Sequence, residues 1–246
     1  MSRSDQFQAG SFGAGAVEYA KSRPHYPLDA VRWLVPAHAD KVLDLGAGTG
    51  HLTRGLSECG FDVIAVEPSE GMRREFARTS PDVPVLAGTA EQIPLEDDSV
   101  DAVVVAQAWH WIDVDAAAPE LRRVLRTAGE LGLVWNIRDE REPWVAELGR
   151  IMHQGVEQDM GSENPYVGEL FEPIERYDVE WVYQLSRPRL LELVASRSYI
   201  ITLEPGAKQQ VLDSVAELLN THPAVRTRSR IDLPYVTRCS RTRLAA

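Results

Sequence analysis

Residues 41–136 alternate short apolar runs with segments whose apolar positions follow a helical period. The runs are rich in Val, Leu and Ile and have the length of buried strands. The predicted strands are KVLDL (41–45), DVIAVE (62–67), VPVLAGT (83–89), VDAVVVAQA (100–108) and ELGLVWN (130–136), and the predicted helices are 49–60, 69–79 and 115–127. This alternation predicts an α/β fold: a doubly wound, mostly parallel sheet with helices on both faces.

The pattern becomes less regular after residue 136. It predicts helices over 142–158, 187–196 and 207–220, and strands over 179–185 and 231–240. Pro234 lies inside the last strand, and because proline has no N–H to donate, it predicts a sheet edge or a bulge. We interpret residues 1–246 as one domain, with an irregular helical insertion over 138–179 that covers the active site.

Charge and composition narrow the possible partners. The chain has a formal net charge of −11, which disfavours binding to nucleic acid. Its N-terminus lacks the apolar core of a signal peptide, and no apolar run is long enough for a membrane span. Cys59 and Cys239 are too few for a disulfide framework. We therefore expect a cytoplasmic protein that acts on a small molecule, with no membrane or nucleic-acid partner and an oligomeric state that the sequence leaves open.

Three alternating glycines follow the first predicted strand in the stretch VLDLGAGTGHLTRG. Gly46, Gly48 and Gly50 permit positive φ and allow a ligand to lie directly on the backbone. At this turn of a doubly wound sheet, ligands bind beyond the carboxyl ends of the strands. A dinucleotide fingerprint would need a third glycine where His51 stands, and no P-loop lysine follows. The loop thus predicts an extended ligand of another kind.

The stretch DLGAGTG resembles the first motif of the class I S-adenosylmethionine-dependent methyltransferases. Three further segments match this family in order and spacing: Glu67 with EPSEGM, then GTAEQIPLEDDSVDAVV, then AQAWHWID. The resemblance implies a Rossmann-like fold with S-adenosylmethionine as cofactor. It implies that Glu67 binds the ribose hydroxyls. The cofactor-binding residues that it implies are Asp44, Gly46, Ala47, Gly48, Gly50, Glu67, Pro68, Ser69, Met72, Thr89, Ala90, Glu91, Ala106 and Gln107.

The segments GAVEYAKSRPHYP, QAWHWID and DLPYVTRCSR are similar to one small-molecule subgroup of this family, the methyltransferases like trans-aconitate methyltransferase. This resemblance implies that residues 1–35 lie over the cofactor. Tyr19 and Arg23 would approach its methionine end, with Arg23 at the carboxylate. The alternative is that Tyr19 and Tyr26 are packing residues and that Arg23 is a surface charge.

Aromatic residues follow the fourth and fifth predicted strands, where an acceptor pocket is expected. Methyl transfer from a sulfonium needs alignment and exclusion of water, for which aromatic and neutral polar walls are suited. Tyr26, Trp109, His110, Trp111 and Trp135 are therefore the candidate pocket residues, although a core role for the tryptophans is an alternative. His110 is a candidate base, or it orients the substrate. No Cys or His cluster has metal-ligand spacing.

These features predict an enzyme that methylates a small organic acceptor, at a carboxylate or hydroxyl, by in-line displacement. Two alternatives stay open. One is a module that binds S-adenosylmethionine without turnover, and the other is an NAD-dependent oxidoreductase. The sequence does not distinguish O-, N- and C-methylation.

Overall fold

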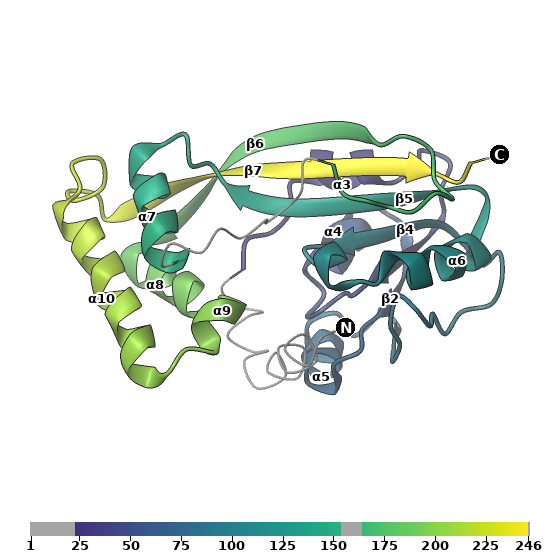
Figure 1. The fold of residues 1–246 in the computed structure, drawn as a ribbon, viewed down its shortest axis with the longest axis horizontal. Helices are drawn as coiled ribbons and strands as arrows, with labels where there is room; N and C mark the ends of the chain where they lie inside the picture. The colour runs from purple at the N-terminus through teal and green to yellow at the C-terminus, as the bar shows by residue number, and fades with distance from the viewer. Residues whose placement is uncertain (1–22, 154–163, 246) are drawn as a thin grey trace.

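The computed structural model describes residues 23–153 and 164–245, which form a sheet of seven strands flanked by helices (Figure 1). The strand order is β3-β2-β1-β4-β5-β7-β6. The first five strands pair in parallel, and β7 pairs antiparallel with both β5 and β6. The strands are β1 (Lys41–Leu45), β2 (Asp62–Val66), β3 (Val85–Leu86), β4 (Val100–Ala106), β5 (Leu125–Arg138), β6 (Glu175–Ser186) and β7 (Arg230–Arg243). The predicted mostly parallel α/β sheet is confirmed.

Helices cover both faces of the parallel part of the sheet. Helices α3 (Leu28–Leu34) and α4 (His51–Glu58) bury Leu34 and Leu56 in the core cluster that contains Val42 of β1. Helix α6 (Val114–Val124) packs Leu121 into a second core cluster, on β4 and β5. Helix α5 (Glu70–Thr79) lies beside β3. The sheet is thus buried on both faces, as its continuous apolar strands require.

Two helix starts carry side-chain caps close to the carboxyl ends of the strands. The Ser69 hydroxyl accepts a hydrogen bond from the amide of Met72 at the start of α5. The Asp113 carboxylate accepts one from the amide of Ala116 at the start of α6. Such caps satisfy backbone donors that have no partner within the helix. They fix where the loops that precede α5 and α6 end.

Pro234 does not lie in an edge strand, so that prediction is wrong. Strand β7 is internal, between β5 and β6. Its pairing with β5 ends at Tyr235, opposite Arg138, and the Pro234 carbonyl accepts a hydrogen bond from the amide of Asp139, just beyond β5. In an antiparallel ladder the amide and carbonyl of one residue face the same neighbour. The missing N–H of Pro234 therefore faces the point where β5 has ended.

Four helices form a separate cluster at one end of the long antiparallel strands (Figure 1). They are α7 (Pro143–His153), α8 (Arg187–Ala195), α9 (Ser198–Ile201) and α10 (Pro205–Thr221). Only α7 falls in the segment 138–179, and residues 175–179 of that segment belong to β6. The helical cluster is therefore built from two parts of the sequence, with α8 to α10 between β6 and β7.

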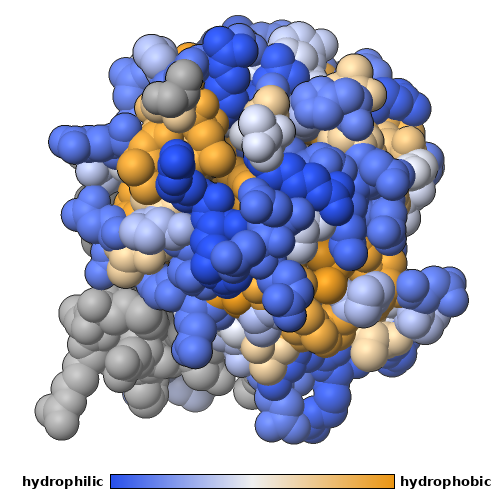
Figure 2. Space-filling view, turned by 90° about the vertical axis from the view of Figure 1, so that its right-hand side faces the viewer, coloured by the Kyte–Doolittle hydropathy of each residue, from blue (hydrophilic) through white to orange (hydrophobic). Residues whose placement is uncertain are grey.

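The opposite end of the molecule is predominantly hydrophilic, with hydrophobic residues in separate patches (Figure 2). Across the described ranges 23–153 and 164–245, none of the helices combines the length and hydrophobicity that a bilayer span needs.

Candidate functional site

The glycine loop between β1 and α4 has the conformation that the sequence predicts. Gly46, Gly48 and Gly50 all have positive φ, of 72°, 57° and 82°. The amides of Gly46 and Ala47 both donate to the carbonyl of Val66, which fastens the loop to the end of β2. A Cβ on Gly46 would lie 3.3 Å from Ala108, whereas one on Gly48 would meet nothing within 4 Å. The loop thus presents bare backbone to open space at Gly48.

Glu67 lies directly after β2 and joins the glycine loop to the next loop. One of its carboxylate oxygens accepts a hydrogen bond from the Gly48 amide at 2.9 Å, and the other accepts one from the Ser69 amide at 2.8 Å. The residue is only 6% exposed, and this burial raises the pKa of its carboxyl group. Each carboxylate oxygen has a further acceptor site. The arrangement provides an acidic hydrogen-bond acceptor beside naked peptide, which fits the ribose of an adenosine-type ligand.

Asp44 lies behind the glycine loop and has no solvent exposure. Its Oδ2 accepts a hydrogen bond from the Thr53 hydroxyl, and its Oδ1 is buried without a hydrogen-bond partner among the described residues. Burial raises the pKa of this carboxyl group from 3.8 to about 7. The carboxyl group thus joins the end of β1 to α4 through Thr53. Its direct contact with a ligand stays a prediction.

Replacing Asp44 by Asn is expected to stabilise the unliganded protein above pH 7. The unfolded carboxyl ionises near 3.8 and the folded one near 7, so the folded state binds the proton more tightly. Ionisation of Asp44 therefore lowers the unfolding free energy. This loss is absent below about pH 4, grows as the pH rises to 7 and stays constant at higher pH. Three pH units correspond to roughly 4 kcal/mol, which is an upper limit for the gain.

Chemical denaturation of wild type and Asp44→Asn at pH 5 and pH 8 measures this effect. The difference in unfolding free energy between the two proteins should be roughly two and a half times as large at pH 8 as at pH 5. The exposed Asp40 provides the control, since Asp40→Asn should give the same small difference at both values. An Asp44→Asn protein less stable than wild type at pH 8 would contradict the assigned burial cost.

The residues predicted to border an adenine lie in the loop before α5, in the first turn of α5 and in the loop after β3. Pro68 is exposed, Ser69 caps α5 and Met72 is 4% exposed. In the other loop, Thr89 pairs with Gln92 across a tight turn, and Ala90 is buried. The Glu91 carboxylate accepts a hydrogen bond from the amide of Asp113 at 3.1 Å. This bond holds the Thr89–Gln92 turn against the segment that follows β4.

Strand β4 ends at Ala106. The next residue, Gln107, has a φ of 58°, which is unusual for a residue with a side chain. The side-chain amide nitrogen of Gln107 donates to the backbone carbonyl of Asn136 at 3.2 Å. The Asn136 side chain donates in turn to the carbonyl of His25 and accepts from the Thr237 hydroxyl. These bonds join the ends of β4 and β5 and the middle of β7 to the segment before α3.

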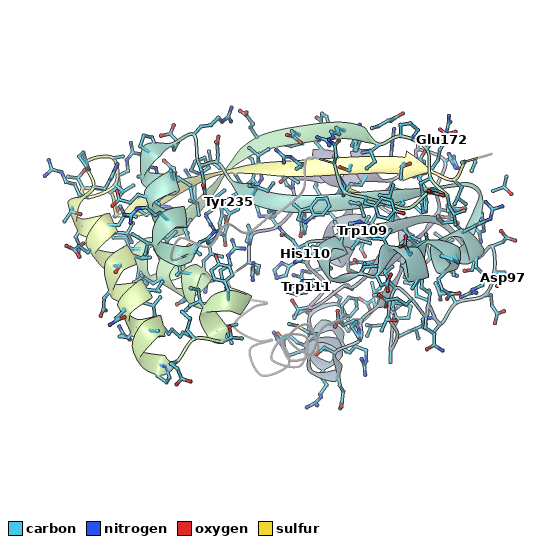
Figure 3. The ribbon with its side chains drawn as sticks, viewed as in Figure 1. Asp97, Trp109, His110, Trp111, Glu172 and Tyr235 are labelled. Atoms are coloured by element: carbon cyan, nitrogen blue, oxygen red, sulfur yellow. The ribbon has the colours of Figure 1, made fainter. Side chains whose placement is uncertain are left out.

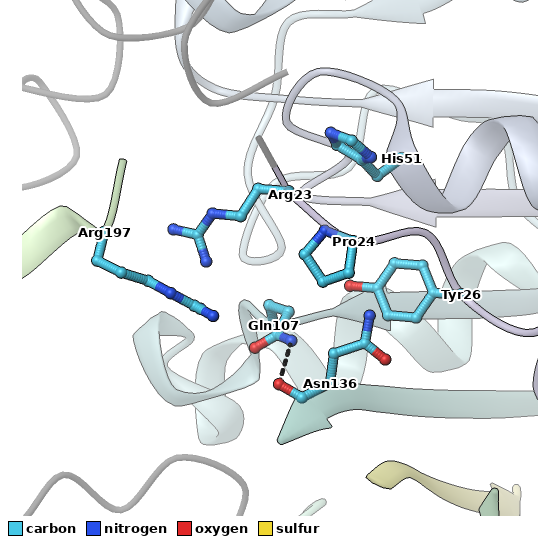
Figure 4. Close-up of a pocket in the computed structure, with 7 residues that line it drawn as sticks. All are labelled: Arg23, Pro24, Tyr26, His51, Gln107, Asn136 and Arg197. Carbon is cyan, nitrogen blue, oxygen red and sulfur yellow. Dashed lines mark hydrogen bonds between the residues drawn. The ribbon is translucent and has the colours of Figure 1, made fainter. Parts of the chain in front are cut away.

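A pocket opens at this junction, with a volume of about 300 Å³ including its mouth (Figure 4). Arg23, Tyr26 and Gln107 were predicted as site residues and line it. Tyr19, also predicted, lies outside the described residues. The other lining residues, which were not among the predicted site residues, are Pro24, His51, Asn136 and Arg197. Of these, His51 and Asn136 adjoin the predicted motifs, whereas no local pattern marks Arg197.

The aromatic residues after β4 form a group of their own. Trp109, His110 and Trp111 form one turn of 3₁₀ helix, and the rings of His110 and Trp111 lie 4.7 Å apart. Figure 3 shows the three together on the side of the sheet that faces the helical cluster. Trp109 and Trp135 are 4% and 3% exposed and belong to the core on β4 and β5. None of the four lines the pocket, so their contact with an acceptor stays a prediction.

The pocket differs in charge from the acidic protein around it. Among the residues that the structure describes, its lining includes two arginines and no carboxylate. Within the part of the chain that the structure describes, no group of three His, Cys, Asp or Glu could hold a metal ion. The arrangement favours a neutral or anionic group over a cation inside the pocket.

Residues 43–133 match the family described as Methyltransferase domain. The chain is 50% identical over 235 residues to an uncharacterized methyltransferase of Mycobacterium tuberculosis, and the match covers 96% of both chains. An uncharacterized methyltransferase-like protein of Schizosaccharomyces pombe is 32% identical, with 95% of each chain covered. A solved structure from Anaeromyxobacter dehalogenans, considered a type II methyltransferase, has a TM-score of 0.68 and 26% identity, and covers 90% of this chain and 97% of that one. The family match spans the glycine loop, Glu67 and the end of β4.

Proposed function

The chain belongs to the class I S-adenosylmethionine-dependent methyltransferases, and we propose from this premise that it methylates a carboxylate or hydroxyl of a small organic acceptor. Family membership makes the protein a methyltransferase, and the acceptor class is the proposal. The observation that supports the cofactor site is the bond between Glu67 and the Gly48 amide, which holds an acidic hydrogen-bond acceptor at a bare loop. The observation that favours an anionic acceptor is the presence of Arg23 and Arg197 in the pocket.

The residues at the strand ends fit the cofactor. Glu67 would accept the ribose hydroxyls, the backbone at Gly48 would support the amino-acid end, and Arg23 in the pocket would meet its carboxylate. The loop from Thr89 to Gln92 would border the adenine. When bound, S-adenosylmethionine supplies a methyl group already activated by its positively charged sulfur.

The chain then has to position the acceptor and keep water out. Gln107 and Asn136 offer neutral amides in the pocket, and Tyr26, 7% exposed, closes one wall. Neutral polar walls suit a reaction in which a positive charge disappears, because a strongly anionic wall would stabilise the starting state. Alignment of this kind is worth about 7–11 kcal/mol in favourable cases. Positioning is therefore the main catalytic contribution that we assign to these residues.

The nature of the acceptor decides whether a base is needed. A hydroxyl must lose its proton, whereas a carboxylate is already ionised at neutral pH. His110, the candidate base, is exposed and does not line the pocket. This placement supports a carboxylate as the reacting group, and an orienting role of His110 stays a prediction. A small-molecule acceptor of the trans-aconitate methyltransferase-like kind accords with this proposal.

Binding and transfer assays test the proposed function in two steps. S-adenosylhomocysteine at a hundred times its dissociation constant should stabilise the protein by about 2.7 kcal/mol, and NAD should not. Tritium from labelled S-adenosylmethionine should then enter a base-labile ester when the protein is incubated with mixed organic acids. Stabilisation by NAD alone would overturn the proposal in favour of an oxidoreductase. Cofactor binding without transfer to any acid or alcohol would indicate a binding module.

A further inference from the structure

Arg197 is a buried cation with no counter-ion among the described residues. It lies between α8 and α9, is 3% exposed, and lines the pocket. One of its terminal nitrogens donates to the Tyr235 hydroxyl at 3.2 Å, and its Nε has no hydrogen-bond partner within residues 23–153 and 164–245. Among the described residues, no carboxylate lies within 4.0 Å of its guanidinium. A charge buried in this way is unfavourable unless a partner arrives from outside.

The residues behind Arg197 add positive charge and do not neutralise it. Arg138, 8% exposed, lies 3.3 Å from the Nε2 of His153. Burial, together with Arg138 and Arg197, lowers the pKa of His153 to about 4, so its ring is neutral at pH 7. Among the described residues, Arg138 makes a weak pair with the exposed Glu140, at 4.0 Å. Two buried guanidinium groups thus act on His153, and one of them, that of Arg197, lines the pocket.

Aromatic packing holds Tyr235, the hydrogen-bond partner of Arg197, in place. The ring of Tyr235 stacks on that of Trp181 at 5.4 Å, and Tyr235 itself is 1% exposed. The Trp181 ring nitrogen donates to Thr237 on β7. The Tyr235 hydroxyl therefore has little freedom, and it sets the direction in which Arg197 extends from the helical cluster. A planar guanidinium held in one orientation is suited to a carboxylate.

Arg23 approaches the same space from the opposite side. It donates to the carbonyl of Ser196, the neighbour of Arg197, at 3.4 Å. Figure 4 shows the side chains of Arg23 and Arg197 extending into the pocket from two separate segments, beside Gln107. If Arg23 meets the carboxylate of the cofactor, as the proposed function has it, Arg197 remains to bind an anionic group of the other ligand.

We propose that Arg197 is the specificity-determining residue for the acceptor and binds a carboxylate of that acceptor. This inference rests on the proposed function and narrows it: the acceptor is a carboxylic acid, anchored from the helical cluster, while the cofactor is held by the sheet. Tyr235 is a positioning residue, because it acts through Arg197.

Equilibrium binding to the protein saturated with S-adenosylhomocysteine tests this assignment. The probes are succinate, fumarate and benzoate, each compared with its carboxamide at millimolar concentration. At least one acid should bind, and its carboxamide should not. The substitution Arg197→Met should lower the affinity for that acid at least tenfold. Arg189→Met, at an exposed arginine of α8 paired with Glu192, is the matched control and should bind as wild type. Equal affinity of wild type and Arg197→Met, or no binding by any acid, would overturn the proposal.

Two further measurements separate this result from misfolding and from a role at the cofactor. The melting temperature of Arg197→Met without ligand should not fall, because the substitution removes an uncompensated buried charge. Arg197→Met should also bind S-adenosylhomocysteine and 5′-methylthioadenosine, which lacks the amino-acid end, as tightly as wild type. A selective loss of S-adenosylhomocysteine would place Arg197 at the cofactor and overturn the assignment. Failure of wild type to bind S-adenosylhomocysteine would instead refute the proposed function.

The variant Tyr235→Phe probes the positioning role. It should lower the affinity for the acid several-fold and leave the affinity for S-adenosylhomocysteine unchanged. The variant Arg197→Lys should recover part of the affinity for the acid that is lost in Arg197→Met. Unchanged acid binding by Tyr235→Phe would remove Tyr235 from the proposal.

Discussion

The substitution Glu67→Ala is expected to lower the affinity for S-adenosylhomocysteine by at least a hundredfold. Hydrogen bonds to a charged acceptor are worth about 1.5–3 kcal/mol each, and the ribose offers two hydroxyl donors. The substitution also releases the amides of Gly48 and Ser69, which Glu67 holds in place. Isothermal titration of the purified protein with S-adenosylhomocysteine measures the loss.

Two variants make this measurement specific. Glu67→Gln keeps one amide oxygen as acceptor and should lose less affinity than Glu67→Ala. Glu70→Ala removes an acid of the same charge three positions away, at an exposed residue paired only with Arg74, and should bind as wild type. Full affinity in Glu67→Ala would show that the ligand's sugar lies elsewhere.

The second large effect is expected for Gly48→Ala. A Cβ at this position would project into the open space where the cofactor is proposed to rest on the backbone, so binding should weaken by one to two orders of magnitude. The positive φ also strains alanine by roughly 1–2 kcal/mol, which lowers stability. The dissociation constant for S-adenosylhomocysteine and the melting temperature are the two readouts.

Gly60 provides a close control for this substitution. Its φ is 92°, and an added Cβ there would likewise meet nothing within 4 Å, but it lies after α4, at the far end of that helix from the glycine loop. Gly60→Ala should therefore show a similar loss of stability with unchanged binding. If both variants bound equally well, the bare backbone at Gly48 would have no role in recognition.

The glycine loop and Glu67 could be predicted because their signals are local. Three glycines need positive φ within five residues, and an acid ends the adjacent strand, so the order of the strands brings the two together. The same holds for the caps at Ser69 and Asp113, whose partners are three residues away. Short-range geometry needs no knowledge of the rest of the chain.

Arg197 could not be predicted, because its environment is made by distant segments. Its hydroxyl partner Tyr235 lies 38 residues later, and Arg23 lies 173 residues before its neighbour Ser196. In the sequence, Arg197 looks like an ordinary polar residue just after the end of α8. The error at Pro234 has a related cause: β5 ends opposite Tyr235, whereas β7 runs on past it and pairs with β6, and periodicity does not encode where a neighbouring strand ends.

Strand β7 contributes to both ends of the molecule without a break. Ile231 and Leu233 belong to the core of the helical cluster, whereas Cys239 belongs to the core under α3 and α4. No single cut in the sequence separates the part that we assign to the acceptor from the part assigned to the cofactor. Chimaeras that exchange one contiguous segment between relatives would therefore mix the two, and altering the proposed acceptor specificity requires changes spread over at least two stretches of the gene.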